Sequence, residues 1–110
     1  MPSPNKRARE KLRGAVHRLV VGEGDVRARL VSAHWLLNQL SASGLPKELQ
    51  EPWRQLISDL TKRGPVLSPD GEVQTPACKH TMSRIRNSTG REIAERIYSL
   101  HTDIEFMSNK

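Results

Sequence analysis

The segment "SRIRNSTGREIAERIYSLHTDI", residues 83–104, decides the fold class because its apolar residues return every three or four positions. With the preceding methionine they form a single face, whose members are Met82, Ile85, Thr89, Ile93, Ile97, Leu100 and Ile104. This spacing is typical of an amphipathic α-helix that packs one side on a core. The segment therefore predicts a long helix at the C-terminal end of a helical protein.

Four poor helix formers, Asn87 to Gly90, interrupt this pattern. The apolar register continues across them, so one long helix fits the sequence. The run from Thr89 to Glu92 also matches a capping box, in which a second helix would begin at Thr89. Both interpretations are compatible with the sequence.

The preceding sequence predicts a hairpin of two helices. Asn5 is a candidate cap for the first helix, which should end at the glycines of residues 22–24. Asp25 has the side chain to cap the second helix, and Gly44 can end it. Because the connector is so short, the two helices should run antiparallel.

A third helix should start near Pro46 or Pro52, with an apolar stripe that includes Trp53. Because Pro52 lacks a backbone donor, we expect a kink or a split just before it. The stretch from Arg63 to Pro76 holds three prolines and two glycines and is expected to be a loop. A short β-hairpin around the "SPDG" turn is the alternative, and Thr75 should cap the next helix.

The predicted fold is all-α, a small bundle of about four helices with a Pro/Gly-rich loop before the C-terminal helix. The 110 residues suffice for one domain. We assign residues 5–107 to a single helical domain with its long loop at 63–76, residues 1–4 to a flexible N-terminus and residues 108–110 to a C-terminal tail.

Composition narrows the choice of partner. There are 18 Lys and Arg against 12 Asp and Glu, a net charge of +6, which favours a polyanionic or acidic partner. The single cysteine excludes an intrachain disulfide and fits a reducing, cytoplasmic location. No apolar run is long enough for a signal-peptide core or a membrane span, so no contact with a membrane is expected.

A basic cluster around the interruption is the first candidate site. It contains Lys79, Arg84, Arg86, Asn87 and Arg91. On one continuous helix, His80, Arg84, Asn87 and Arg91 would share a stripe; at a new helix start, free amides would add to the attraction for a phosphate or carboxylate. The alternative is a solvated face in which Glu92 fills the anion position.

A second basic run lies at the N-terminus and contains the candidate phosphate contacts Lys6, Arg7 and Arg9. The alternative is a solvated helix end. The "VGEGD" junction could also form the turn of a helix-turn-helix, with Arg27 and Arg29 as contacts, although the second helix is apolar like a core helix. These two arginines would otherwise pair with Asp25 or Glu23, or with an external anion.

No pattern of catalytic or metal-binding residues is present, so we expect a protein that is not an enzyme and has no cofactor or metal. Cys78 and His80 are close in sequence but two residues apart on a helix, which points them in different directions. The other histidines lack the spacing of metal ligands. Trp35 and Trp53 should anchor the core, or else top an exposed protein-binding patch.

Two blocks, "GEGDVRARL" and "RIRNSTGREIAERIYSL", resemble a group of short, uncharacterised bacterial proteins that have no known activity. They cover about a quarter of the chain. The resemblance implies a bacterial or mobile-element origin.

The sequence thus favours a small basic non-enzymatic protein that binds nucleic acid through phosphate contacts. The alternative is a protein-interaction factor, such as an accessory or inhibitor of a bacterial defence or mobile-element system, which docks on a larger acidic or nucleic-acid-binding protein. A homodimer is also compatible with the narrow apolar stripes. The choice between DNA, RNA and protein stays open.

Overall fold

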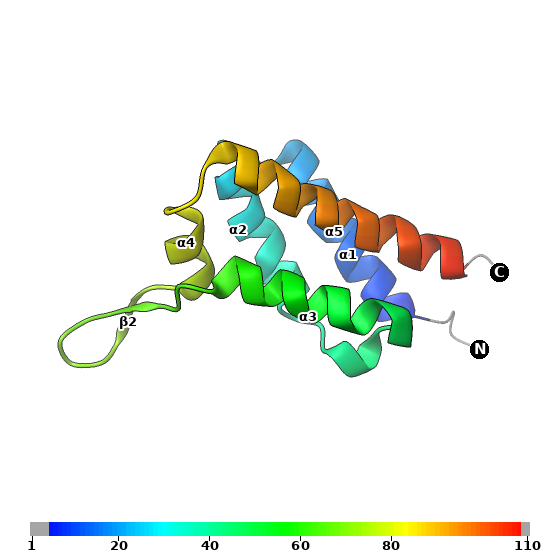
Figure 1. Cartoon of the computed structure of the whole chain (residues 1–110), viewed down its shortest axis with the longest axis horizontal. Helices are drawn as coiled ribbons and strands as arrows, with labels where there is room; N and C mark the ends of the chain where they lie inside the picture. The colour runs from blue at the N-terminus through cyan, green and yellow to red at the C-terminus, as the bar shows by residue number, and fades with distance from the viewer. Residues whose placement is uncertain (1–4, 109–110) are drawn as a thin grey trace.

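The computed structural model describes residues 5–108, with side chains described for 5–107, and shows an elongated helical bundle of 50 × 28 × 20 Å. Figure 1 shows the helices and strands in their order along the chain. The elements are α1 (Lys6–Val21), α2 (Val26–Leu37), the 3-10 turn η1 (Ala42–Gly44), α3 (Lys47–Thr61), β1 (Val66–Leu67), β2 (Val73–Thr75), α4 (Ala77–Met82) and α5 (Asn87–Ser108).

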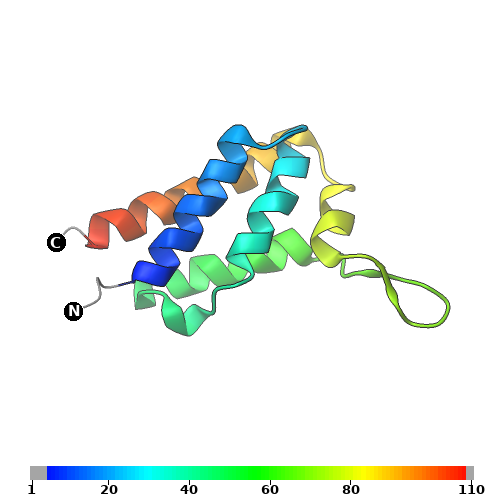
Figure 2. The ribbon, with the colours of Figure 1, turned by 180° about the vertical axis from the view of Figure 1, so that it is seen from behind.

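The helices form two layers. α1 and α2 are the expected antiparallel hairpin, and α3 and α5 cover one side of it (Figures 1 and 2). The short α4 closes one end of the bundle, and α5 starts there before running to the opposite end, where α1 begins. The all-α prediction is confirmed. The segments assigned to a flexible N-terminus and a C-terminal tail lie outside the described residues, except that Ser108 still belongs to α5.

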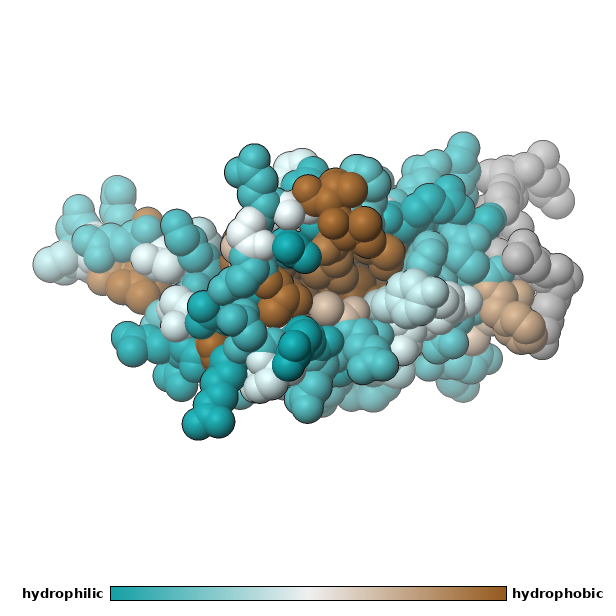
Figure 3. Space-filling model, turned by 90° about the horizontal axis from the view of Figure 1, so that it is seen from above, coloured by the Kyte–Doolittle hydropathy of each residue, from teal (hydrophilic) through white to brown (hydrophobic). Residues whose placement is uncertain are grey.

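The core consists of the apolar stripes that the periodicity predicted. Its largest fully buried apolar side chains come from all five α-helices and are Leu12, Leu30, Leu37, Leu56, Leu60, Met82, Ile97 and Ile104. Each buried Leu or Ile contributes about 1.5–3 kcal/mol through its removal from water. Seen from above, the surface is mostly hydrophilic, with hydrophobic side chains gathered near the end of α1 (Figure 3). There Val20 is 72% exposed and Val21 59%.

The structure contains only some of the helix caps that the sequence predicted. The Asp25 carboxylate accepts hydrogen bonds from the amides of Arg27 at 3.0 Å and Ala28 at 3.2 Å, as a side-chain cap should. Asn5 precedes α1 but makes no capping bond, and its φ is 61°. α2 ends at Leu37, well before Gly44. The predicted cap at Thr75 is wrong, since Thr75 closes β2 and Pro76 precedes α4.

Pro52 does not split α3, which runs from Lys47 through Pro52 to Thr61. The predicted split is therefore wrong. The three-residue stripe Leu49, Leu56 and Leu60 is buried on one side of the helix, whereas the proline itself is exposed. Burial of this stripe holds the helix together despite one missing backbone bond.

The segment expected to be a loop contains a small hairpin. β1 and β2 pair antiparallel, with Val66 opposite Thr75 and Leu67 opposite Val73 around a bulge. The Gly71 amide donates a hydrogen bond to the Ser68 carbonyl at 2.9 Å, which closes the turn. Gly71 has a φ of 88°, a conformation that glycine adopts readily. The hairpin extends away from the bundle beside α4 (Figures 1 and 2).

Candidate functional site

The interruption in the C-terminal pattern is a real break, and it lies earlier than the capping box indicated. α4 ends at Met82, residues 83–86 form a turn, and α5 begins at Asn87. The Ser83 hydroxyl donates to the His80 carbonyl at 2.6 Å, and the Gly90 amide donates to the Arg86 carbonyl at 3.0 Å. Thr89 therefore lies inside the first turn of α5, and neither open interpretation, one continuous helix or a helix that begins at Thr89, is correct.

A contact from α2 holds the turn. The Arg27 guanidinium donates to the Ile85 carbonyl at 3.0 Å and also forms an ion pair with Asp25 at 2.9 Å. The hydrogen bond from Arg27, followed by that from the Ala28 amide, lowers the pKa of Asp25. Arg27 thus satisfies a carbonyl that the helix break leaves without a helical partner.

Gly90 lets the start of α5 lie directly on the start of α2. A Cβ at this position would be 2.9 Å from Val26 Cγ1 and 3.5 Å from Arg27 Cγ. Gly90 is buried inside a helix, where glycine otherwise destabilises. Close packing, not a turn, explains this glycine, and it fixes the position of the α5 N-terminus.

The first amides of α5 have no bonding partner. Within residues 5–108, no acceptor bonds to the backbone N–H groups of Asn87, Ser88 and Thr89. The Glu92 side chain makes no hydrogen bond to them either, so it does not fill the anion position. These amides and the helix dipole leave a local positive charge at the surface.

Four cations belong to the elements that lead into this helix start: Lys79 lies on α4, Arg84 and Arg86 lie in the turn, and Arg91 lies in α5. Lys79, Arg84, Arg86 and Arg91 are exposed, and within the described part of the chain their side chains form no ion pair or hydrogen bond. Because α4 ends before Ser83, His80 does not share a helical stripe with them, and that prediction is wrong. Its Nδ1 instead lies 2.9 Å from the Gly64 carbonyl oxygen. We call the surface of Lys79, Arg84, Arg86, Asn87 and Arg91 the basic turn.

The N-terminal cations belong to the other end of the molecule and have a different role. Arg9 and Arg13 bind the Glu105 carboxylate at 3.1 and 2.8 Å, and Arg7 donates to the Gln39 carbonyl at 3.2 Å. The hydrogen bond from Arg9 is the largest cause of the lowered pKa of Glu105, and the hydrogen bond from Arg13 is the second. These side chains fasten α1 to the end of α5 and to the segment after α2. Lys6 is exposed and has no such contact among the described residues.

The basic turn and the N-terminal cluster therefore do not form one site. Arg91 and Glu105 are fourteen residues apart on α5, which is about 21 Å along a helix. Lys6, Arg7 and Arg9 lie at the end of the molecule where α5 finishes, and the basic turn lies where it starts (Figure 1).

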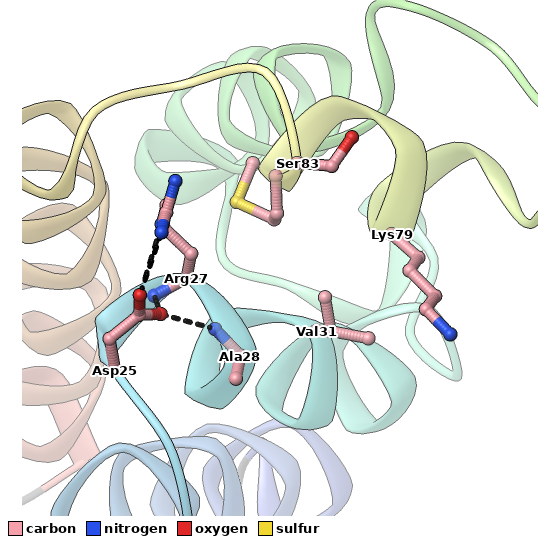
Figure 4. A pocket seen from close by; sticks show the side chains of 7 residues that line it. Asp25, Arg27, Ala28, Val31, Lys79 and Ser83 are labelled. Carbon is pink, nitrogen blue, oxygen red and sulfur yellow. Dashed lines mark hydrogen bonds and ion pairs between the residues drawn. The ribbon is translucent and has the colours of Figure 1, made fainter.

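A groove lies between α2 and α4, next to the basic turn (Figure 4). One part has a volume of about 540 Å³ and is lined by Asp25, Arg27, Ala28, Val31, Lys79, Met82 and Ser83. A second part, about 490 Å³, is lined by Val31, His34, Trp35, Asn38, Thr61, Pro76, Ala77, Cys78 and Lys79. Val31 and Lys79 line both parts, so the two parts are adjacent, and together they are here called the α2–α4 groove.

Cys78 and His80 are not joined by a hydrogen bond among the described residues. Cys78 is buried, and burial raises the pKa of its thiol to about 12. The Nδ1 atom of His80 contacts the Gly64 carbonyl instead. No group of three His, Cys, Asp or Glu side chains in the described chain could hold a metal ion.

Trp35 lies on the side of α2 opposite the buried Leu30 and Ala33 and is 63% exposed. Its expected role as a core anchor is therefore wrong, and its exposure agrees with the alternative of a surface position. Trp53 is partly buried against the core, as expected. The Arg18 guanidinium lies 5.4 Å from the ring centroid of Trp35.

The helix-turn-helix interpretation finds no support in the α1 and α2 hairpin. Arg27 is held by Asp25 and Ile85, and Arg29 donates to the carbonyls of Gly24 and Leu19. α5 also packs on the first turn of α2 at Gly90. Both arginines are therefore engaged within the chain rather than presented to a groove of DNA.

Comparisons with protein-family models, with curated proteins and with solved structures found no match for this chain. None of the helices in the described residues combines the length and hydrophobicity that crossing a bilayer demands.

Proposed function

We propose that the protein binds nucleic acid through phosphate contacts made by the basic turn. The observation that carries this proposal is the contrast in how the arginines are used. Arg9, Arg13, Arg27 and Arg96 are engaged by acidic side chains, whereas Lys79, Arg84, Arg86 and Arg91 bind nothing among the described residues. Unpaired cations beside free helix amides match the geometry and charge of phosphate groups.

No enzymatic role is part of the proposal, and no cofactor or metal is needed. The binding energy would come largely from the release of counterions. A reducing, cytoplasmic compartment remains part of the proposal because the only cysteine is a free, buried thiol.

A salt titration tests the proposal directly. Binding to labelled duplex and single-stranded oligonucleotides should be measured by anisotropy at increasing salt. We expect binding at low salt and a steep, linear fall of log affinity with log salt concentration. Absence of binding to every oligonucleotide at low salt would reject the proposal.

The basic turn can be tested against a control with equal charge. R84A/R86A removes two cations from the turn, and K47A/K62A removes two exposed cations at the two ends of α3 that have no ion pair among the described residues. We expect R84A/R86A to flatten the salt slope by about 0.7–0.9 for each phosphate that these arginines neutralise in the wild-type complex. If K47A/K62A weakens binding by the same factor, only net charge matters and the basic turn is not the site.

The exposed apolar surface at the end of α1 favours a second function, contact with a protein. Val20 and Val21 are exposed next to Leu19 in α1, and Leu19 and Val16 are partly buried against the core. A larger protein or a second copy of the chain would cover this surface. V20D should then abolish self-association in sedimentation experiments, and a monomeric wild-type protein would exclude the homodimer.

A further inference from the structure

The α2–α4 groove carries a pre-positioned aromatic ring. Trp35 lies on α2 one turn beyond Val31 and is 63% exposed, although tryptophan side chains are mostly buried in folded proteins. The Arg18 guanidinium lies over its ring at 5.4 Å and also donates to the Ser32 hydroxyl at 3.1 Å. This contact orients the ring, and so much exposure leaves ring surface open to a ligand.

The groove connects Trp35 to the basic turn. Trp35 and Lys79 line the smaller part of the groove. Lys79 also lines the larger part, together with Ser83, which is the first residue after α4. Along α2 the lining extends from Asp25 to Asn38, about 20 Å on a helix. Figure 4 shows Val31 of α2, Lys79 of α4 and Ser83 of the turn around this hollow.

The charge of the groove is complementary to a polyanion. Asp25 is the only acidic residue in its lining among the described residues, and Arg27 already binds that carboxylate. Lys79 is exposed on the shared wall and makes no contact with an acid in the described chain. The remaining lining is mostly apolar and includes Ala28, Val31 and Ala77.

We infer that the α2–α4 groove binds single-stranded nucleic acid, with a base stacked on Trp35 and the adjoining phosphates at Lys79 and the basic turn. A cationic track with an aromatic platform is the combination by which proteins hold unpaired strands. Duplex bases are already stacked on each other and cannot reach the ring. The inference rests on the proposed nucleic-acid binding and adds the class of nucleic acid.

Tryptophan fluorescence isolates the proposed contact. W53F leaves Trp35 as the only tryptophan of the chain. Titration with a short oligothymidylate should quench the emission, and the matching duplex should quench it far less. Equal quenching by polyglutamate would show that the groove accepts any polyanion or acidic peptide. A change in Trp35 emission with protein concentration alone would show that a second copy of the chain occupies the groove. Either result overturns the inference.

Affinity measurements on variants separate stacking from charge. W35A should weaken binding to the single strand by roughly 5- to 150-fold and leave duplex binding unchanged. W35F, which keeps a ring face, should retain most of the affinity. Y98A removes an exposed aromatic from α5, outside the groove lining, and should have no effect. Circular dichroism should confirm that all three variants are folded.

The two proposals fail in different ways. If W35A binds single strands and duplexes with the same affinities as the wild-type protein, this inference is wrong but the proposed phosphate binding stands. If no nucleic acid binds at low salt, both are wrong.

Discussion

Gly90 of α5 packs against Val26 of α2 so closely that a Cβ on Gly90 would lie 2.9 Å from Val26 Cγ1. This contact joins the two helix starts that flank the basic turn. Since the turn follows α4 and leads into α5, the position of its cations depends on this packing. The stability of the fold should therefore be sensitive to any side chain added at Gly90.

G90A should destabilise the protein although alanine is the better helix former. The gain in helix propensity is about 1 kcal/mol, whereas overpacking of a tight contact costs about 1–3 kcal/mol. Chemical denaturation of G90A should therefore show a net loss of unfolding free energy.

V26A supplies the control, because it removes the methyl group that the new Cβ would meet. In a double-mutant cycle, G90A should become neutral or stabilising in the V26A background. Equal effects of G90A in both backgrounds would contradict the packing explanation.

Glu105 should make stability depend on pH under acidic conditions. Its pKa is lowered from the ordinary value of 4.5 by Arg9 and then Arg13, so the folded state binds this proton less readily than the unfolded state does. The stabilisation is present above about pH 4.5 and is lost as the pH falls through the lower pKa of the folded state.

E105Q tests this dependence. It should lower the melting temperature at pH 7, and the difference from wild type should shrink toward zero as the pH falls from 4.5 through the lowered pKa of Glu105. The burial of His34 lowers its pKa as well, but that contribution is common to both proteins and cancels in the comparison. A difference that stays constant with pH would rule out an ionic role for Glu105.

The Cys78 thiol should be inert in the folded protein. It is buried, and burial raises its pKa to about 12, so almost no thiolate is present at about pH 8. A thiol-reactive dye should label Cys78 slowly under native conditions and at the rate of a free thiol in guanidinium. Rapid native labelling would show that the groove opens to expose it.

Thr81 should anchor α4 to the segment after α3. It is fully buried, donates to the Ala77 carbonyl at 2.9 Å and accepts from the Arg63 amide at 3.1 Å. T81V keeps the shape but removes the acceptor, which should cost about 1–3 kcal/mol because the Arg63 amide loses its partner.

Hydrogen exchange gives the local readout for T81V. The Arg63 amide should exchange much faster in T81V than in wild type, while T81S, which keeps the hydroxyl, should protect it. Loss of stability with unchanged exchange at Arg63 would mean that the hydroxyl acts through α4 alone.

Periodicity predicted much of the bundle correctly. Leu12, Leu30, Leu56 and Ile97 are buried where the three- and four-residue spacing placed them, because an amphipathic helix has one way to hide its apolar face. The Asp25 cap was also predictable, since it depends only on residues two and three positions ahead.

Local signals failed where a distant contact competes with them. Thr89 and Glu92 match a capping box, but Arg27 holds the Ile85 carbonyl and Gly90 packs on Val26, so the helix starts two residues earlier. Trp35 lies opposite the buried Leu30 and Ala33 of α2, and only the tertiary structure shows that α4 places it on a groove. Such outcomes depend on neighbours that a periodicity cannot specify.

The candidate site, too, was predicted in part from the sequence and in part only from the structure. The sequence supplied every residue of the basic turn, but it also offered Lys6, Arg7 and Arg9. The structure separates the two groups by their places at opposite ends of α5, and it gives partners to Arg7 and Arg9. An arginine's charge is a property of its type, whereas its availability depends on whether an acid such as Glu105 reaches it.

By itself, then, the sequence determined the helical class, the hairpin of α1 and α2 and the excess of positive charge, because each follows from short-range spacing or from composition. The tertiary structure decided where α5 begins, which cations of the described chain have no acidic partner and that Trp35 lies on a groove. The physical reason is that these features arise from contacts between residues far apart in the chain, such as Arg27 with Ile85 and Arg9 with Glu105.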